Sequence, residues 1–251
     1  MQKEEKYEGA ELRSPFFKWW DNFWYHYKWH SLIALFLVLA LTICTVQMCT
    51  KEDYDLHVMY AGAADVKKTS DSGLSEYAIL LSSLKLAMED YDEDGSVSVD
   101  LQTLFLPSEE EILEIEQTLP EGYAVQTQLV MDNGKHLQSQ MLLSDYYLCF
   151  LSEANYLSYR DRTKGFFAPL TPYVGSAEVT YYEGRTDAVY LSSTTFGKIA
   201  GWSQLPENTL ICLRSVSEVA ERADSKNSKK QFERAEQTLR NLFATVTEAQ
   251  S

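Results

Sequence analysis

Histidine and cysteine are both scarce in this chain, with four of each among 251 residues. Cys44 and Cys49 lie in a long apolar run, so a framework of several disulfides is excluded. Only His57 and His136 follow that run, which leaves little material for a Ser/His or Cys/His catalytic pair. The G-x-S-x-G, H-E-x-x-H and phosphate-binding glycine-loop motifs are also missing. We therefore predict that the protein is not an enzyme.

Positive charge is in short supply. The chain has 22 Lys and Arg residues against 37 Asp and Glu residues, a net charge of −15. Residues 1–30 contain five basic and five acidic side chains, so the acidic excess lies entirely beyond residue 30. A surface of this charge repels phosphate backbones, which argues against nucleic acid as a partner.

Long hydrophobic runs are absent except for one. Residues 32–46 contain no charged side chain, and residues 31–49 come close to the ~20 residues that span a hydrocarbon core of ~30 Å. Backbone amides in lipid must be bonded within the segment, so the run is predicted to form a transmembrane helix. A core helix would show a polar face, and a cleaved signal peptide would have a shorter leader and a small-residue cleavage site.

The flanking charges predict the orientation of this helix. Arg13, Lys18 and Lys28 precede the run, whereas Lys51 is followed at once by acidic residues. Because basic residues stay in the cytoplasm, we expect the N-terminus inside and the C-terminal domain outside the cell. The predicted parts are a cytoplasmic or interfacial segment at 1–30, a transmembrane helix at 31–49, a linker at 50–55 and an extracellular domain at 56–251.

Nine of the residues from Phe16 to His30 are aromatic, and four of these are Trp. Trp and Tyr favour the headgroup zone, because an apolar ring and a polar edge are both satisfied there. We expect an interfacial helix that turns into the bilayer, with the lipid bilayer as its partner. The alternative is a docking site for another membrane protein. His26 and His30 have a metal-binding spacing, but no third ligand accompanies them.

Strand and helix patterns alternate in the domain, which predicts an α/β fold with a mostly parallel sheet flanked by helices. The expected strands are 56–60, 97–105, 147–151, 179–182, 188–191 and 210–216. The expected helices are 74–91, 109–119, 136–143, 153–160 and 229–246, with a strand-like VQTQLVM at 125–131. Two capping boxes are predicted, at Ser108 and Ser228. Cys149 and Cys212 are expected as buried free thiols, with a disulfide between them as the alternative.

An acidic stretch from Asp90 to Leu101 resembles a calcium loop of the EF-hand type. Oxygen donors recur at alternate positions, and Gly95 stands where such a loop turns sharply. Leu101 replaces the bidentate Glu at the twelfth position, so a solvated acidic turn is the alternative. The expected calcium ligands are Asp90, Asp92, Asp94, Ser96, Ser98 and Asp100.

The stretch from His136 to Val174 resembles the first lobe of extracellular solute-binding proteins of ABC importers. The resemblance rests on a helix, a strand, a short helix, and then a phrase like G-x-L-x-P-L-x-x-Y, here Gly165 to Tyr173. It covers about half of the domain, and solute-binding proteins are about twice this size, with a full second lobe. It implies a binding module for a small molecule or peptide at the cell surface. The alternative is a non-liganded scaffolding subunit of a membrane or envelope complex.

In sheets of this kind, ligands bind beyond the carboxyl ends of the strands. Five of the residues expected there lie at or shortly after the ends of the strands 56–60 and 147–151, and Trp202 and Arg214 are possible additions. The predicted ligand-binding residues are Tyr60, Asp65, Ser152, Glu153, Tyr156, Trp202 and Arg214.

Overall fold

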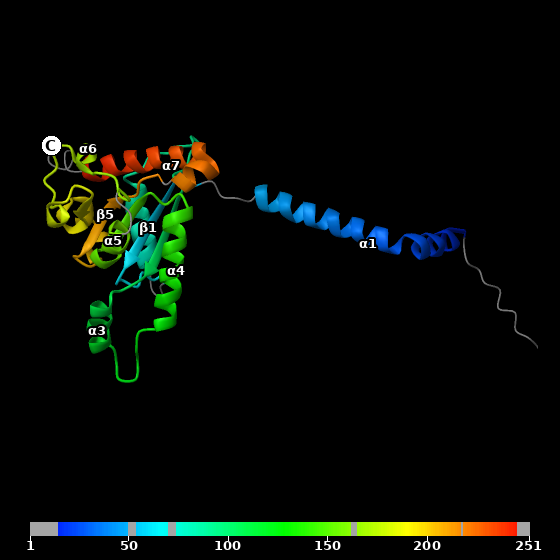
Figure 1. Cartoon of the computed structure of the whole chain (residues 1–251), viewed down its shortest axis with the longest axis horizontal. Coiled ribbons are helices and arrows are strands. Elements are labelled where there is room, and N and C mark those ends of the chain that lie inside the picture. Colours follow the sequence, from blue (N-terminus) through cyan, green and yellow to red (C-terminus); the bar gives the residue numbers. More distant parts are fainter. Residues whose placement is uncertain (1–14, 50–53, 70–73, 162–164, 217, 245–251) are drawn as a thin grey trace, which may run out of the picture. The chain divides into compact units, whose positions relative to one another are not determined.

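A computed structural model describes residues 15–49, 54–69, 74–161, 165–216 and 218–244, with backbone alone at 15–18, 21–22, 46–49 and 218–225 (Figure 1). The chain divides into two compact units between residues 52 and 53. That boundary lies inside the predicted linker.

The first unit contains helix α1 (Pro15–Cys49), which runs without interruption through the aromatic and the apolar segments. Residues 23–45 of this helix are long and apolar enough to cross a membrane. The expected turn between an interfacial helix and the apolar helix is therefore absent. No Pro or Gly lies between residues 16 and 49 to break the helix. At 1.5 Å per residue α1 is about 52 Å long, more than a hydrocarbon core of ~30 Å requires.

Aromatic rings stack along the exposed surface of α1. The ring centroids of Trp19 and Phe23 are 5.6 Å apart, and those of Trp20 and Trp24 are 6.2 Å apart. Further along the helix, the hydroxyls of Thr42 and Thr45 donate to backbone carbonyls four residues earlier, both at 2.8 Å. These two polar side chains are thus satisfied inside the helix, as an apolar solvent requires.

The second unit is an α/β domain built on a five-stranded sheet in the order β2-β1-β3-β5-β4. The strands are β1 (Leu56–Gly62), β2 (Val99–Phe105), β3 (Leu148–Ser152), β4 (Ala188–Tyr190) and β5 (Thr209–Leu213). β1 pairs in parallel with β2 and β3, whereas β5 pairs antiparallel with β3 and β4. The expected parallel arrangement is found only in the β2-β1-β3 half. The chain between β4 and β5 forms only short 3-10 turns, and a parallel return needs a longer crossover, usually a helix.

Helices cover the sheet, and most lie where the sequence predicted them (Figure 1). They are α2 (Glu76–Lys85), α3 (Glu109–Thr118), α4 (Thr127–Leu143), α5 (Glu153–Arg160), α6 (Thr171–Val174) and α7 (Glu218–Ala244). The 3-10 helices are η1 (Tyr182–Gly184), η2 (Leu191–Ser193), η3 (Phe196–Lys198) and η4 (Trp202–Gln204). The capping box at Ser108 is confirmed.

Three local predictions were wrong. The strand-like segment VQTQLVM mostly belongs to α4, because Leu137 and Met141 further along that helix are buried against the sheet. Ser228 lies inside α7 rather than at its start, and its hydroxyl donates to Asp145 at 3.0 Å. The expected strand at 179–182 makes only an isolated bridge, from Tyr181 to Val189.

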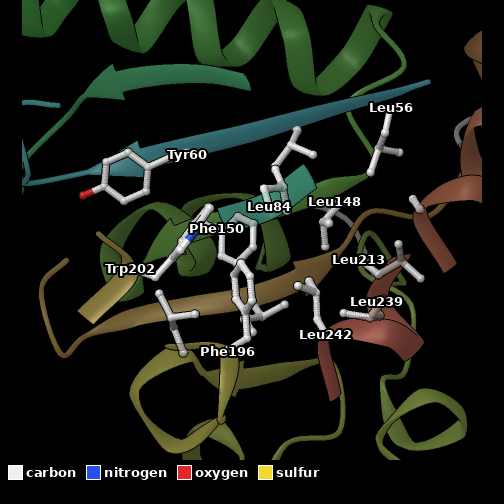
Figure 2. Close-up of a cluster of buried hydrophobic side chains, with 14 of the residues drawn as sticks. Leu56, Tyr60, Leu84, Leu148, Phe150, Phe196, Trp202, Leu213, Leu239 and Leu242 are labelled. Carbon is white, nitrogen blue, oxygen red and sulfur yellow. The ribbon is translucent and has the colours of Figure 1, made fainter. Parts of the chain in front are cut away.

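Alternating side chains of the strands build one hydrophobic core on each face of the sheet. Tyr60 of β1 joins the first core, where the rings of Phe150 and Trp202 lie 4.4 Å apart and Phe196 packs beside them (Figure 2). Its neighbour Met59 points to the opposite face and joins the second core, which α4 and α5 cover. The parallel strands are therefore held from both sides, and their carboxyl ends are fixed in space.

Candidate functional site

An open cleft of about 940 Å³ lies at the carboxyl ends of the three parallel strands. Ala63 follows β1, Ser108 follows β2 and Glu153 follows β3, and all three line the cleft. Residues 206–208, just before β5, close the remaining side. The cleft lies at the opposite end of β1 from Tyr54, where the described part of the domain begins. This is the position at which sheets of this kind bind ligands.

Helix α3 forms one wall of the cleft, and its first turn is fixed by two sets of hydrogen bonds. The backbone N–H of Ser108 donates to Glu111 Oε2 at 2.7 Å, and the backbone N–H of Glu111 donates to Ser108 Oγ at 3.2 Å. The other carboxylate oxygen of Glu111 accepts from Asn208 Nδ2 at 2.8 Å. The start of α3 is thereby tied to the loop before β5.

Helix α5 forms the opposite wall and is anchored to the strand ends by Asn155. The Asn155 side-chain amide donates to the carbonyls of Ala61, at 3.3 Å, and Leu106, at 3.0 Å. It also donates to Oγ of Ser152, which caps the N-terminus of α5. One side chain thus joins the ends of β1, β2 and β3, which positions Glu153 and Ala154 at the cleft.

The cleft is strongly acidic. Among the described residues that line it, none is Lys or Arg, and Ile115, Leu157 and Ala154 provide apolar surface between the acids. Carboxylates that share one cleft repel each other, and a bound cation relieves that repulsion. The acidic lining residues are Glu109, Glu110, Glu111, Glu114, Glu153 and Glu207.

A smaller hollow of about 450 Å³ adjoins the cleft and shares Glu153, Glu207 and Asn208 with it. Tyr190 stands in this hollow and donates its hydroxyl to Glu153 Oε1 at 3.0 Å. Burial and this hydrogen bond raise the pKa of Tyr190 to about 12. Tyr190 is therefore a hydrogen-bond donor at neutral pH, and its hydroxyl orients the Glu153 carboxylate.

The structure does not bring the seven predicted ligand-binding residues into one site. Glu153 lines the acidic cleft, while Asp65 and Trp202 line two other hollows. Tyr60 is buried and its hydroxyl accepts from the backbone N–H of Ala64 at 3.0 Å. Ser152 is the cap of α5, and the buried Tyr156 donates to Asp187 at 2.8 Å.

Arg214, the seventh of these residues, has a structural position. Its side chain is fully buried, with the guanidinium 4.6 Å from the ring centre of Tyr147. The guanidinium donates to the carbonyls of Met141, at 2.8 Å, Tyr146, at 3.0 Å, and Ser144. Burial lowers the pKa of Arg214, although the pKa of a guanidinium starts so high that the group stays charged. The residue therefore pairs the carbonyls around the end of α4 and does not face a ligand.

The predicted calcium ligands also separate into groups. Asp90 Oδ2 accepts from the backbone N–H of Gly95 at 2.8 Å, and Asp94 Oδ1 accepts from both the backbone N–H and the hydroxyl of Ser96. Within the loop, the acidic side chains thus bond to the loop itself. Asp100 lies on β2 and accepts from Tyr146 and from the His57 ring.

Asp100 is half-buried, and its pKa reflects two opposing effects. Burial raises the pKa of this carboxyl, but the hydrogen bonds from His57 and Tyr146 outweigh it and lower the pKa below the ordinary value. These bonds hold Asp100 against the sheet, away from the Asp90 loop. Ser98 also has a partner outside the acidic loop, because its backbone N–H donates to Asp55 at 2.9 Å.

A different acidic group does come together. Carboxylate oxygens of Asp55, Asp90 and Asp92 lie within 4.8 Å of one another. Partial desolvation and the nearby charges of Asp55 and Asp94 raise the pKa of Asp92. The sequence did not point to Asp55, because it precedes Asp90 by a strand, a loop and a helix.

Apart from Glu153, the sequence did not point to the cleft glutamates. The Ser-Glu-Glu-Glu stretch at 108–111 has the local pattern of a helix cap, and that pattern carries no sign of a binding site. Its proximity to Glu153 and Glu207 depends on the pairing of β1 with β2 and β3, and on the return of the chain at residues 206–208. The one signal in the sequence is the large number of acidic residues between 109 and 116.

The chain matches no protein-family model, and comparisons with curated proteins and with solved structures give no match. The resemblance to a solute-binding lobe therefore stays a prediction.

Proposed function

We propose that the protein is a membrane-anchored binding module whose acidic cleft recognises a positively charged peptide. The observation that carries this proposal is the lining of the cleft, where the residues that the structure describes include six glutamates and neither Lys nor Arg. Each of these carboxylates attracts a bound cation, and none of the described lining residues repels it. The net charge of −15 adds a long-range attraction that increases the rate of encounter.

The shape of the cleft favours a peptide over a small molecule. Small-molecule sites are enclosed and mostly apolar, and they bury most of the ligand. This cleft is open and is lined by glutamates as well as apolar side chains, and it extends from α3 to residues 206–208. A solute-binding-like ancestry would fit both the α/β sheet and a site at the strand ends, with the function moved from a solute to a peptide.

We further propose that α1 spans the membrane, with the N-terminus in the cytoplasm and the binding domain outside the cell. The support is the helix of residues 23–45, which is long and apolar enough to cross a membrane, and the basic residues that precede its uncharged part at 32–46. Protease treatment of intact cells should then degrade the domain and leave an epitope fused to the N-terminus intact. Loss of that epitope under the same conditions would show the opposite orientation, with the N-terminus outside the cell.

The binding proposal is tested with the full chain in nanodiscs of zwitterionic lipid, which avoids attraction of the peptide to the bilayer. The probes are two 12-residue peptides, one alternating Lys with Ser and one alternating Glu with Ser. We expect calorimetry to detect binding of the Lys peptide alone, with an affinity that falls as salt rises.

A matched pair of variants assigns the binding to the cleft. The cleft variant replaces Glu110, Glu114 and Glu207 with Gln, and the control variant replaces the exposed Glu89, Glu121 and Glu178 with Gln. Both lose three charges, so a purely long-range effect weakens binding equally. We expect a loss of about tenfold for the cleft variant, from three exposed ion pairs of roughly 0.5 kcal/mol each. No binding by the native chain, or equal losses in both variants, would refute the proposal.

A second candidate function is weak calcium binding by Asp55, Asp90 and Asp92. The specific observation is the approach of their carboxylates to within 4.8 Å. Carboxylate oxygens are the ligands that calcium prefers, and water would complete the coordination. Of the six calcium ligands expected from the sequence, this group contains Asp90 and Asp92, and Asp55 is added to them.

A further inference from the structure

The cleft contains apolar surface that a simple cation would not use. Between the glutamates it is lined by Ala63, Ile115, Ala154, Leu157 and Pro206. A polyamine or a metal ion would contact the carboxylates and leave this apolar surface exposed to solvent. A ligand that fills the cleft must therefore combine positive charge with apolar side chains.

Helix α3 is also incompletely packed within the domain. None of its residues is buried, and Leu113 has 61% of its surface exposed. Figure 1 shows α3 and the loop after it extending away from the sheet. An isolated helix of this length is marginal in water, and its fixed points here are the Ser108 capping box and the Glu111–Asn208 bond.

We infer, resting on the proposed function, that the ligand is a segment of another protein in which Lys or Arg residues flank apolar side chains, and that it docks along α3. Its cations pair with Glu110, Glu114 and Glu207, and its apolar side chains cover Ile115 and Leu157. The negative charge of the cleft glutamates complements the positive charge of such a segment. Ile115 of α3 and Leu157 of α5 provide its apolar anchor points.

Docking along α3 stabilises the helix as well as the ligand. A helix without buried residues gains packing when a partner covers it, so exchange of its backbone amides should slow on binding. This response separates a docked segment from a cation held only by flexible carboxylates. Slower amide exchange in α3 also shows where the ligand binds, and this measurement needs only the native chain.

The experiment uses the full chain in zwitterionic nanodiscs and three probes with matched charge. The first is a 12-residue peptide with four Lys and two Leu, the second has Ala in place of both Leu, and the third is spermine. We expect the Leu peptide to bind about tenfold more tightly than the Ala peptide or spermine, from the burial of two Leu side chains. Only the Leu peptide should slow amide exchange across residues 109–118. Binding to empty nanodiscs is subtracted.

Two variants locate the apolar contact. Ile115→Ser should remove most of the advantage of the Leu peptide and leave the Ala peptide unchanged. Leu86→Ser, at an exposed position outside the cleft, should change neither. Equal affinities for all three probes would overturn this inference and leave the proposed function standing. No binding of any probe would overturn both, and an advantage of Leu that survives Ile115→Ser would place the contact elsewhere and refute docking along α3.

Discussion

Cys149 lies directly opposite Cys212 in the antiparallel pairing of β3 with β5, and both side chains are fully buried. Both are free thiols. Burial raises the pKa of Cys149 to about 12 and raises the pKa of Cys212 well above its ordinary value. The reactive thiolate is therefore almost absent at neutral pH, even though the two residues share a register position.

The first prediction is that neither thiol reacts in the folded state. In a chain with Cys44→Ala and Cys49→Ala, iodoacetamide at pH 8 should modify fewer than one site before unfolding and two after it. Intact-mass measurement follows the reaction. Rapid modification of the folded protein would contradict the burial, and a mass lower by about two hydrogens would show a disulfide instead.

The second prediction concerns Arg214. Arg214→Leu leaves the carbonyls of Met141, Ser144 and Tyr146 without their shared donor, so the domain should lose about 2–4 kcal/mol of unfolding free energy. Arg214→Lys should recover only part of this, because an ammonium cannot reach three separated carbonyls. The exposed Arg240→Leu is the control. Thermal unfolding in detergent, followed by Trp fluorescence, measures all three, and a native-like transition in Arg214→Leu would refute the capping role.

The third prediction uses two glycines in opposite environments. A Cβ on Gly197 would lie 1.9 Å from the carbonyl oxygen of Leu191, so Gly197→Ala must displace backbone and should cost about 2 kcal/mol or more. Gly134 lies within α4 and its nearest neighbour would be a methyl of Leu106 at 3.7 Å, an ordinary contact. Gly134→Ala should therefore stabilise the domain by about 0.5–1 kcal/mol. The same unfolding assay compares them, and equal effects would contradict the tight turn at η3.

Local signals in the sequence predicted much of the fold. The alternation at 97–105, the capping box at Ser108 and the short helix after Ser152 depend on nearest neighbours, and each is found. The helical nature of 127–131 could not be predicted in this way, because Leu137 and Met141 fix that helix against the sheet from beyond the segment. Tertiary packing overrides local propensity at such places.

The candidate site was less predictable than the fold. Glu111, Glu153 and Glu207 come from three parts of the chain, and they meet because of the strand order. The rule that ligands bind at the carboxyl ends of strands selected the edge of the sheet at which Glu153 lines the cleft. It did not separate residues that line the cleft from buried ones such as Tyr60, because the rule gives a position along the strand but no exposure.

The fourth prediction concerns calcium. Millimolar calcium should raise the melting temperature of the native chain relative to chelator, and Asp92→Asn should abolish the rise. Asp94→Asn is the matched control, since Asp94 lies outside the three-carboxylate group and bonds to Ser96. The two variants lose the same charge. No rise in the native chain, or loss of the rise in both variants, would show an acidic turn without a specific site.

The last prediction tests the location of the cleft ligand directly. A 12-residue peptide alternating Lys with Ser, with a photoreactive group at its centre, is irradiated with the full chain in zwitterionic nanodiscs, and the crosslinked residues are identified by mass spectrometry. Our account predicts crosslinks within residues 108–115, 153–157 and 206–208, which an excess of unlabelled peptide removes. Crosslinks that are competed in the same way but lie on α7 or around Asp90 would contradict it.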